Sequence, residues 1–381
     1  MPGPLEGVRV VEVAGLGPAP FGAMCLADMG ADVVVVDRAD RSVGAALSSA
    51  AGDVSGRGRR SIGIDLKHPD AAEVVGRLVD DADVFIEGFR PGVAERLGIG
   101  PDVLRARNPR LIYGRMTGWG QDGPQAHQAG HDINYIAVAG PLAHIGRAGQ
   151  LPTPPLNLVG DFGGGGLLLA FGVVCALQER HRSGLGQTID AAMVDGAALL
   201  GAAMVPAFAM GYLHPERGTN FVDSGAPYYE VYECGDGGLI SVGAIEAKFY
   251  ANLLAGLGLA DADLPAQDDQ ANWPALKERF AAVFATRPRA EWLEVFAGAD
   301  ECVAPVHRYD EVLGDEHVAA RGTYVELDGV LQPAPAPRFD RTPGTLDRPP
   351  APAGHHTDEV LRDAGYDDDA VGGLRRAGVV G

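Results

Sequence analysis

The chain has 381 residues, 51 of them acidic and 31 basic, so its formal net charge at pH 7 is -20. This charge argues against general binding to nucleic acid or to an anionic membrane, and an anionic ligand would need a local basic patch. With 46% hydrophobic residues, the chain is long enough for about two folded domains with sizeable cores.

No segment predicts a membrane span or an export signal. The longest apolar run, residues 167–177, is shorter than the roughly 20 residues that cross a bilayer, so we expect a buried helix there. The N-terminus has no basic segment followed by an apolar stretch, which favours a cytoplasmic location. The cysteines lie far apart, mostly in apolar surroundings, and lack a C-x-x-C spacing and paired histidines, so we expect reduced, buried thiols and no metal site. They are Cys25, Cys175, Cys234 and Cys302.

The first half of the chain alternates strand and helix patterns. Residues 7–13 predict a buried strand, residues 21–29 a helix and residues 32–37 a second strand. The pattern continues with strands at 61–66, 83–87, 111–116 and 187–190 and helices at 71–79, 103–106, 164–182 and 193–212. Strands that alternate with helices predict an α/β fold, with a parallel sheet covered on both faces.

The pattern changes near residue 213. Residues 227–234 and 239–242 are joined by Gly235-Asp236-Gly237-Gly238, which predicts a β-hairpin. Helical patterns then continue to about residue 314, so we expect a second, smaller domain here. Proline-rich stretches at 333–337 and 343–352 predict extended connections.

A glycine-rich loop follows the first predicted strand. Gly15-Leu16-Gly17-Pro18-Ala19-Pro20 precedes a helix, and Asp37 ends the second strand, as in the dinucleotide-binding fingerprint. Pro20 replaces the third glycine of that fingerprint and Pro18 intrudes, which alters the close packing of helix on strand. A structural turn is therefore favoured over a nicotinamide or flavin site.

A basic stretch stands out in this acidic chain. Arg57, Arg59 and Arg60 precede a predicted strand, and Lys67 follows it. Arg38 comes directly after the second strand, at the sheet edge where open α/β folds bind ligands. Guanidinium groups pair bidentately with phosphate. The stretch is either a phosphate site or a solvated loop balanced by neighbouring acids, and composition does not decide between them.

Two candidate proton carriers of different type lie beside glycine-rich backbone. His131 stands in Gly130-His131-Asp132-Ile133-Asn134-Tyr135, and Asp161 opens Asp161-Phe162-Gly163-Gly164-Gly165-Gly166. A histidine and a carboxylate on opposite sides of a carbon can move its proton from one face to the other. Asp161 could equally cap a helix, whose amides could stabilise an enolate oxygen. Glu246, at the end of the predicted hairpin, could orient a histidine or face water.

Longer sequence motifs are distributed along most of the chain. Together they resemble the α-methylacyl-coenzyme A racemase branch of the family III coenzyme A transferase superfamily. Many such motifs in the same order are more specific than any single one. The motifs are Val10-Val11-Glu12, Asp37-Arg38, Asp65-Leu66-Lys67, Glu87-Gly88-Phe89-Arg90-Pro91-Gly92-Val93, Arg107-Asn108-Pro109-Arg110-Leu111-Ile112-Tyr113, Gly118-Trp119-Gly120-Gln121, residues 130–135, residues 155–164, Asp190-Ala191-Ala192-Met193-Val194-Asp195-Gly196 and Pro227-Tyr228-Tyr229.

The resemblance implies a domain arrangement and an assembly. We expect a large Rossmann-like domain, residues 1–212 plus 330–381, that binds coenzyme A, and a smaller α+β domain, residues 213–329. The implied assembly is an interlocked homodimer, with the active site between the large domain of one subunit and the small domain of the other.

The resemblance also assigns site residues. His131 and Asp161 are the implied acid/base pair, with Glu246 supporting His131 and Asn157 supporting Asp161. The implied coenzyme A contacts are Arg38, Ile64, Asp65, Leu66, Lys67, Gly130, Asp132, Ile133, Asn134 and Tyr135, with Arg60 and Arg90 as weaker candidates.

The implied activity is epimerisation of 2-methylacyl-CoA thioesters at the α-carbon, within lipid metabolism. No metal or redox cofactor is required, because coenzyme A is part of the substrate. The main alternative is a coenzyme A transferase in which Asp161 attacks the thioester. A nicotinamide-dependent oxidoreductase and a coenzyme A binding protein without catalysis are further alternatives, and the acyl chain stays open.

Overall fold

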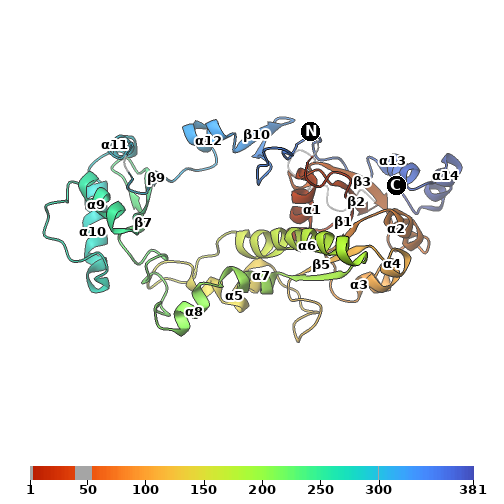
Figure 1. Cartoon of the computed structure of the whole chain (residues 1–381), viewed down its shortest axis with the longest axis horizontal. Helices are drawn as coiled ribbons and strands as arrows, with labels where there is room; N and C mark the ends of the chain where they lie inside the picture. The colour runs from red at the N-terminus through yellow and green to blue at the C-terminus, as the bar shows by residue number, and fades with distance from the viewer. Residues whose placement is uncertain (1–2, 39–53, 299) are drawn as a thin grey trace. The chain divides into compact units, whose positions relative to one another are not determined.

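The computed structural model describes residues 3–38, 54–298 and 300–381, and the chain divides into two compact units (Figure 1). Unit 1 comprises Met1–Ala139, Leu156–Leu200 and Gly322–Gly381, and unit 2 comprises Gly140–Pro155 and Gly201–Arg321. The smaller unit thus includes residues 140–155 and 201–212, which the predicted ranges place in the large domain.

Unit 1 is built on a six-stranded sheet in the order β3-β2-β1-β4-β5-β6, with every neighbouring pair parallel. The strands are β1 (Arg9–Val13), β2 (Asp32–Arg38), β3 (Arg59–Ile64), β4 (Val84–Glu87), β5 (Ile112–Thr117) and β6 (Thr188–Ala192). The run Val33-Val34-Val35-Val36 shows why β2 lies inside, because it is apolar toward both faces. The predicted α/β fold with a parallel sheet is confirmed.

Helices cover both faces of this sheet (Figure 1). Successive strand residues point to opposite faces, so Val33 and Val34 join different cores. The Val34 side is covered by α2 (Ala71–Asp80), α3 (Val93–Arg96), α4 (Pro101–Arg107), α13 (Thr357–Asp363) and α14 (Asp368–Ala377). The Val33 side is covered by α1 (Pro18–Asp28), α5 (Asp132–Ala139), α6 (Leu168–Ser183) and α7 (Met193–Leu200).

The C-terminal residues of unit 1 cover the edge strand β3 (Figure 1). Val380 forms an antiparallel bridge with Ile64, the Gly381 amide donates to the Gly63 carbonyl at 3.1 Å, and the Asp65 amide donates to the Val379 carbonyl at 2.9 Å. These bonds satisfy backbone groups that an edge strand leaves open. The hairpin of β10 (Tyr324–Leu327) and β11 (Val330–Pro333) precedes this segment.

A glycine-rich π-helix, η3 (Leu158–Leu167), runs directly into α6 and packs between α1 and α7. The packing is backbone on backbone: a Cβ at Gly196 would overlap the carbonyl of Gly164, and a Cβ at Gly22 would lie 2.7 Å from the Gly166 oxygen. The sequence predicts a helix from residue 164, and the structure begins it earlier, with wide turns through Asp161.

Together, η3 and α6 form a helix of 26 residues, Leu158–Ser183, which is long and apolar enough to cross a membrane by length and composition alone. It exceeds the apolar run that the sequence delimits. One side packs on β5, β6, α1 and α7, as a core helix does. The other side exposes Leu167, Phe171 and Val174, so the helix is half-buried rather than buried.

Unit 2 has its own aromatic core around a three-stranded antiparallel sheet. The predicted hairpin is present, with Tyr232 opposite Ile240 and the Cys234 amide donating to the Gly238 carbonyl at 2.8 Å. The elements of this unit are α8 (Met204–Ala209), β7 (Tyr229–Glu233), β8 (Leu239–Gly243), α9 (Ala247–Gly256), α10 (Trp273–Phe284), α11 (Arg289–Val295), β9 (Val303–Pro305) and α12 (Glu316–Arg321).

The contact between η3 and α7 predicts a sharp difference between two glycine substitutions. Gly196→Ala should destabilise the protein by about 3 kcal/mol, because the methyl group meets backbone that cannot move aside. Gly373→Ala, in α14 with open space around its Cβ, should stabilise it by about 0.5–1 kcal/mol. Urea unfolding of both variants measures the difference, and equal effects would contradict the packing described.

Candidate functional site

His131 and Asp161 both belong to unit 1 and lie in neighbouring backbone segments. His131 directly precedes α5, and Asp161 lies in the first turn of η3. Asp132 connects the two segments, because its Oδ2 accepts the amides of Gly160 at 2.6 Å and Asp161 at 2.7 Å. The structure therefore brings together the two residues that the sequence proposes as acid and base.

The surroundings of Asp161 raise the pKa of its carboxyl above the ordinary value. Burial is the largest cause, since a half-buried carboxylate loses hydration. The Asn157 side chain opposes it by donating to Oδ2 at 3.0 Å. The charge of Asp132 raises the pKa further, and His131 lowers it. A carboxyl group in this setting is suited to holding and releasing a proton.

The glycine loop before α1 forms one side of the Asp161 environment. Gly17 has φ 72° and precedes α1, and a Cβ built on it would lie 3.1 Å from the Asp161 carboxylate. The loop that resembles a dinucleotide fingerprint is thus a turn that leaves room for this carboxylate. The sequence shows the glycine, whereas its contact with Asp161 depends on the fold.

The charges of Asp161 and Arg90 both act on Tyr135. The ring of Tyr135 packs edge-on against Trp119 with centroids 4.8 Å apart, in space that Gly118 leaves free. Burial raises the pKa of Tyr135, the charge of Asp161 raises it too, and Arg90 lowers it. Tyr135 is therefore the group that experiences the charges of both Asp161 and Arg90.

The loop that carries Arg90 is held at the end of β4 by a buried carboxylate. Glu87 is fully buried and accepts the Phe89 amide at 2.6 Å and Arg115 Nε at 3.0 Å. Arg115 also donates to Glu95 at 2.8 Å. Burial raises the pKa of Glu87 to about 7, against the opposing effects of the Phe89 amide and Arg115. One acidic residue in the apolar strand Val84–Glu87 is the sequence signal for this group.

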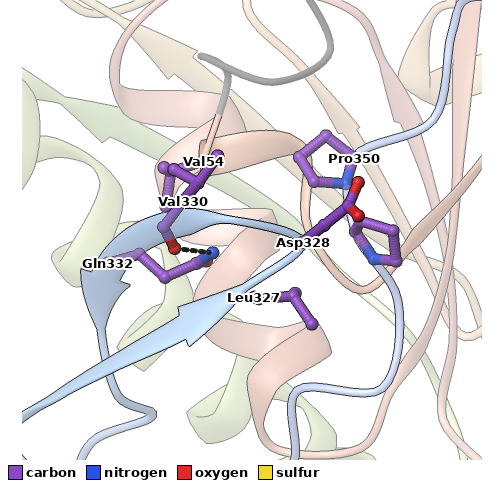
Figure 2. A pocket seen from close by; sticks show the side chains of 7 residues that line it. Val54, Leu327, Asp328, Val330, Gln332 and Pro350 are labelled. Carbon is purple, nitrogen blue, oxygen red and sulfur yellow. Dashed lines mark hydrogen bonds between the residues drawn. The ribbon is translucent and has the colours of Figure 1, made fainter.

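The arginines of the basic stretch form ion pairs with acidic residues inside the protein. Arg57 is buried and donates to Asp28 at 2.5 and 3.0 Å, to Gln332 Oε1 at 3.0 Å and to the Pro333 carbonyl at 2.7 Å. Gln332 lines a small cavity of about 60 Å³ beside β10 and β11 (Figure 2). Arg59 is buried against Glu12.

Arg60 lies near the amino end of β3, buried, and pairs with Asp32 at 2.6 Å, Asp363 at 2.7 Å and Glu359 at 3.0 Å. The structure does not bring it to the carboxyl edge of the sheet, because three acids hold it at the opposite edge. We therefore leave Arg60 out of the proposed coenzyme A contacts. Neighbouring acids balance these charges, as the solvated-loop interpretation states, but the three arginines are buried rather than solvated.

The carboxyl edge of the sheet does bring other candidates together. Arg38 ends β2 directly opposite Ile64, which ends β3, and Arg38 is exposed. Asp65 and Lys67 follow on the surface, and the Asp65 carboxylate accepts the Lys67 amide at 3.1 Å. Leu66 is half-buried.

Glu246 belongs to unit 2, where it directly precedes α9 and is exposed. Its support of His131 therefore stays a prediction. At the start of α5, the Asn134 side chain accepts the His131 amide at 3.1 Å, which fixes the loop of residues 130–135. In the described part of the chain, no group of three or more histidine, cysteine or acidic side chains is placed to hold a metal ion.

Residues 5–357 match the sequence model of CoA-transferase family III, and the chain belongs to this family. It is 47% identical to the α-methylacyl-CoA racemase of Mus musculus and 45% to that of Homo sapiens, each over 96% of this chain and 95% of the relative. It is 32% identical to the succinyl-CoA–L-malate CoA-transferase β subunit of Chloroflexus aurantiacus, over 99% of this chain and 98% of the relative. The predicted family is confirmed.

Solved structures agree with the fold. The crystal structure of a CaiB/BaiF family protein from Brucella suis matches with a TM-score of 0.83 and 26% identity, covering 96% of this chain and all (100%) of that chain. A protein of Mycobacterium tuberculosis matches with a TM-score of 0.79 and 28% identity, covering 94% of this chain and 99% of that chain.

The raised pKa of Glu87 predicts a pH-dependent loss of stability. The folded state binds this proton more tightly than the unfolded state, so stability falls as the pH rises from about 4.5 toward 7. Relative to Glu87→Gln, the unmodified protein should lose about 2 kcal/mol between pH 5 and pH 8, measured by urea unfolding.

Glu95→Gln is the matched control, because Glu95 is the exposed partner of the same arginine and its pKa is lowered. Relative to Glu95→Gln, the unmodified protein should show no such loss toward high pH, because both proteins keep Glu87. An unchanged difference between the Glu87→Gln variant and the unmodified protein across this pH range would contradict the assignment.

Proposed function

We propose that this protein is a racemase that interconverts the two epimers of 2-methylacyl-CoA thioesters at the α-carbon. The observation that carries the proposal is the meeting of His131 and Asp161 in one electrostatic environment, joined by Asp132. The identity of 45–47% to two α-methylacyl-CoA racemases over 96% of the chain supports the same activity.

The chemistry is a proton transfer at one carbon. The thioester acidifies the adjacent C–H bond, so neutral His131 removes the proton from one epimer and protonated Asp161 delivers a proton to the opposite face. In the reverse direction, ionised Asp161 removes the proton and charged His131 returns one. The amides of Asp132 and Ile133 start α5, before its hydrogen-bond ladder begins, and are suited to stabilising the enolate oxygen.

The carboxyl edge of the sheet suits the nucleotide part of the substrate. Arg38 and Lys67 are exposed there, and the charge of Arg90 acts on Tyr135. Cations at the carboxyl ends of parallel strands match the phosphates of coenzyme A. Since coenzyme A arrives with the acyl group, the reaction consumes no separate cofactor.

A coenzyme A transferase is the second candidate, and the 32% identity to a transferase subunit over 99% of the chain favours it. In that reaction Asp161 would attack the thioester carbonyl and form a mixed anhydride, releasing the coenzyme A thiolate. His131 beside Asp161 favours the racemase, because a nucleophilic carboxylate does not need a second proton carrier.

Solvent exchange tests the proposal. Each epimer of a 2-methylacyl-CoA, incubated with the protein in deuterium oxide, should gain one deuterium at the α-carbon and convert to the other epimer, as followed by mass spectrometry and chiral chromatography. His131→Gln and Asp161→Asn should each lower racemisation at least about 100-fold, because each removes one proton carrier. Absence of exchange, with hydroxylamine-sensitive labelling of Asp161, would instead establish the transferase.

We further propose that the protein works as a homodimer. Leu167, Phe171 and Val174 follow one another at helical spacing on the exposed side of η3 and α6, and Phe171 is 65% exposed. An apolar stripe of this kind on a surface helix is typical of a face that another protein covers. A second copy of the chain is the occupant that the family resemblance implies.

Phe171→Asp should weaken the dimer at least about tenfold, because it places a charge in the apolar stripe. Sedimentation velocity across a concentration series measures the shift. Val103→Asp is the control, since Val103 is an exposed apolar residue, 55% exposed, on α4 at the other face of the sheet. A monomeric unmodified protein, or equal behaviour of the two variants, would contradict this interface.

A further inference from the structure

Resting on the proposed racemase function, we propose that the Asp132 side chain is a positioning residue that fixes the backbone of Asp161 against the segment of His131. Its role is distinct from a coenzyme A contact, because the carboxylate is turned into the protein. It sets both the place of Asp161 and the charge that Asp161 experiences.

The Asp132 side chain links the segment of His131 to the segment of Asp161. Asp132 follows His131, and its Oδ2 accepts the amide of Asp161 at 2.7 Å and that of Gly160 at 2.6 Å. The side chain is 6% exposed. A Cβ at Gly160 would lie 2.6 Å from the same oxygen, so this approach requires glycine.

The link takes the place of a local helix cap. The first amides of any helix lack intrahelical partners, and a side chain just before the helix usually accepts them. Asn157, which precedes η3, makes no such bond to the backbone and donates instead to the Asp161 carboxylate at 3.0 Å. Asp161 is therefore held by Asp132 through its backbone and by Asn157 through its side chain.

The second oxygen of Asp132 indicates a role beyond capping. Oδ1 is buried and makes no hydrogen bond to any described residue. Burying an unpaired polar atom is unfavourable, and a neutral cap such as asparagine avoids burying a charge. Asp132 is nevertheless a carboxylate, and its negative charge therefore acts on the groups around it.

Asp161 is the neighbour that this charge affects. The groups of α5 and the preceding segment that face Asp161 are Asp132, His131 and Tyr135, and Arg90 acts on Tyr135. The negative charge of Asp132 favours the protonated form of Asp161. That form, with neutral His131, is the one that starts proton transfer from one of the two epimers.

The other elements packed on η3 bring no competing charge that acts on Asp161 within the described residues. From α1 the approach is by the backbone of Gly17. Asp195 of α7 and Arg115 of β5 act instead on Asp190. Asp132 is thus the acidic group that tunes Asp161.

Two substitutions separate the link from the charge. Asp132→Asn keeps an oxygen that can accept both amides and removes the charge. For the epimer whose proton Asp161 removes, the acid limb of kcat/KM against pH should therefore move down by about half to one pH unit. Racemisation at neutral pH should fall up to about tenfold. Asp132→Ala removes the link as well, and kcat should fall at least about 100-fold with less than about threefold change in KM, because Asp161 is misplaced.

Asp367→Asn is the matched control, since Asp367 caps α14 by accepting the Ala370 amide at 2.8 Å, remote in sequence from the acid–base pair. It should leave the pH profile unchanged. If Asp132→Asn also leaves the acid limb in place, and Asp132→Ala loses activity only in proportion to its unfolded fraction, Asp132 is a cap and the inference is wrong. If Asp132→Ala fails to fold, the pH profile of Asp132→Asn decides. An unmodified protein without deuterium exchange would refute the racemase function itself, which is a separate outcome.

Discussion

The site depends on backbone-to-backbone packing of η3 between α1 and α7. Gly164 meets Gly196, and Gly166 meets Gly22, with no room for a side chain at these contacts. Helices usually approach to 8–10 Å because side chains separate them, and glycine removes that spacing. The wide turns of η3 then place Asp161 beside Gly17 and the start of α5. The carboxylate that we propose as one proton carrier is thus positioned by residues that have no functional groups of their own.

Buried carboxylates divide into two kinds in this structure. Those of Asp28 and Glu12 face arginine and hold the sheet edge and α1 together, so their charge is compensated where it is buried. Asp132 accepts two backbone amides and Asp161 accepts the Asn157 side chain, so neither carboxylate has an arginine partner among these bonds. Partly buried charge without an opposite partner is typical of groups that exchange protons, whereas the arginine-paired carboxylates support the fold.

The sequence predicts the features that depend on neighbouring residues and misses those that depend on distant ones. Apolar runs such as residues 32–37 and the glycine turn at 235–238 predict the parallel sheet and the hairpin, because both are local patterns. The partners of Arg60 come from Asp32, Glu359 and Asp363, so no local pattern shows that its charge is already used. The candidate site is predictable in its acid–base pair, whereas the link through Asp132 appears only in three dimensions.

The pairing of Val379–Gly381 with β3 has a consequence for the order of folding during synthesis. Strand β3 is made early, yet its outer edge is covered by residues that are made some three hundred positions later. Unit 2 is complete in sequence at Arg321, before that cover exists. We therefore expect unit 2 to reach its native structure first during synthesis, while the outer edge of β3 stays open until the last residues of unit 1 are made.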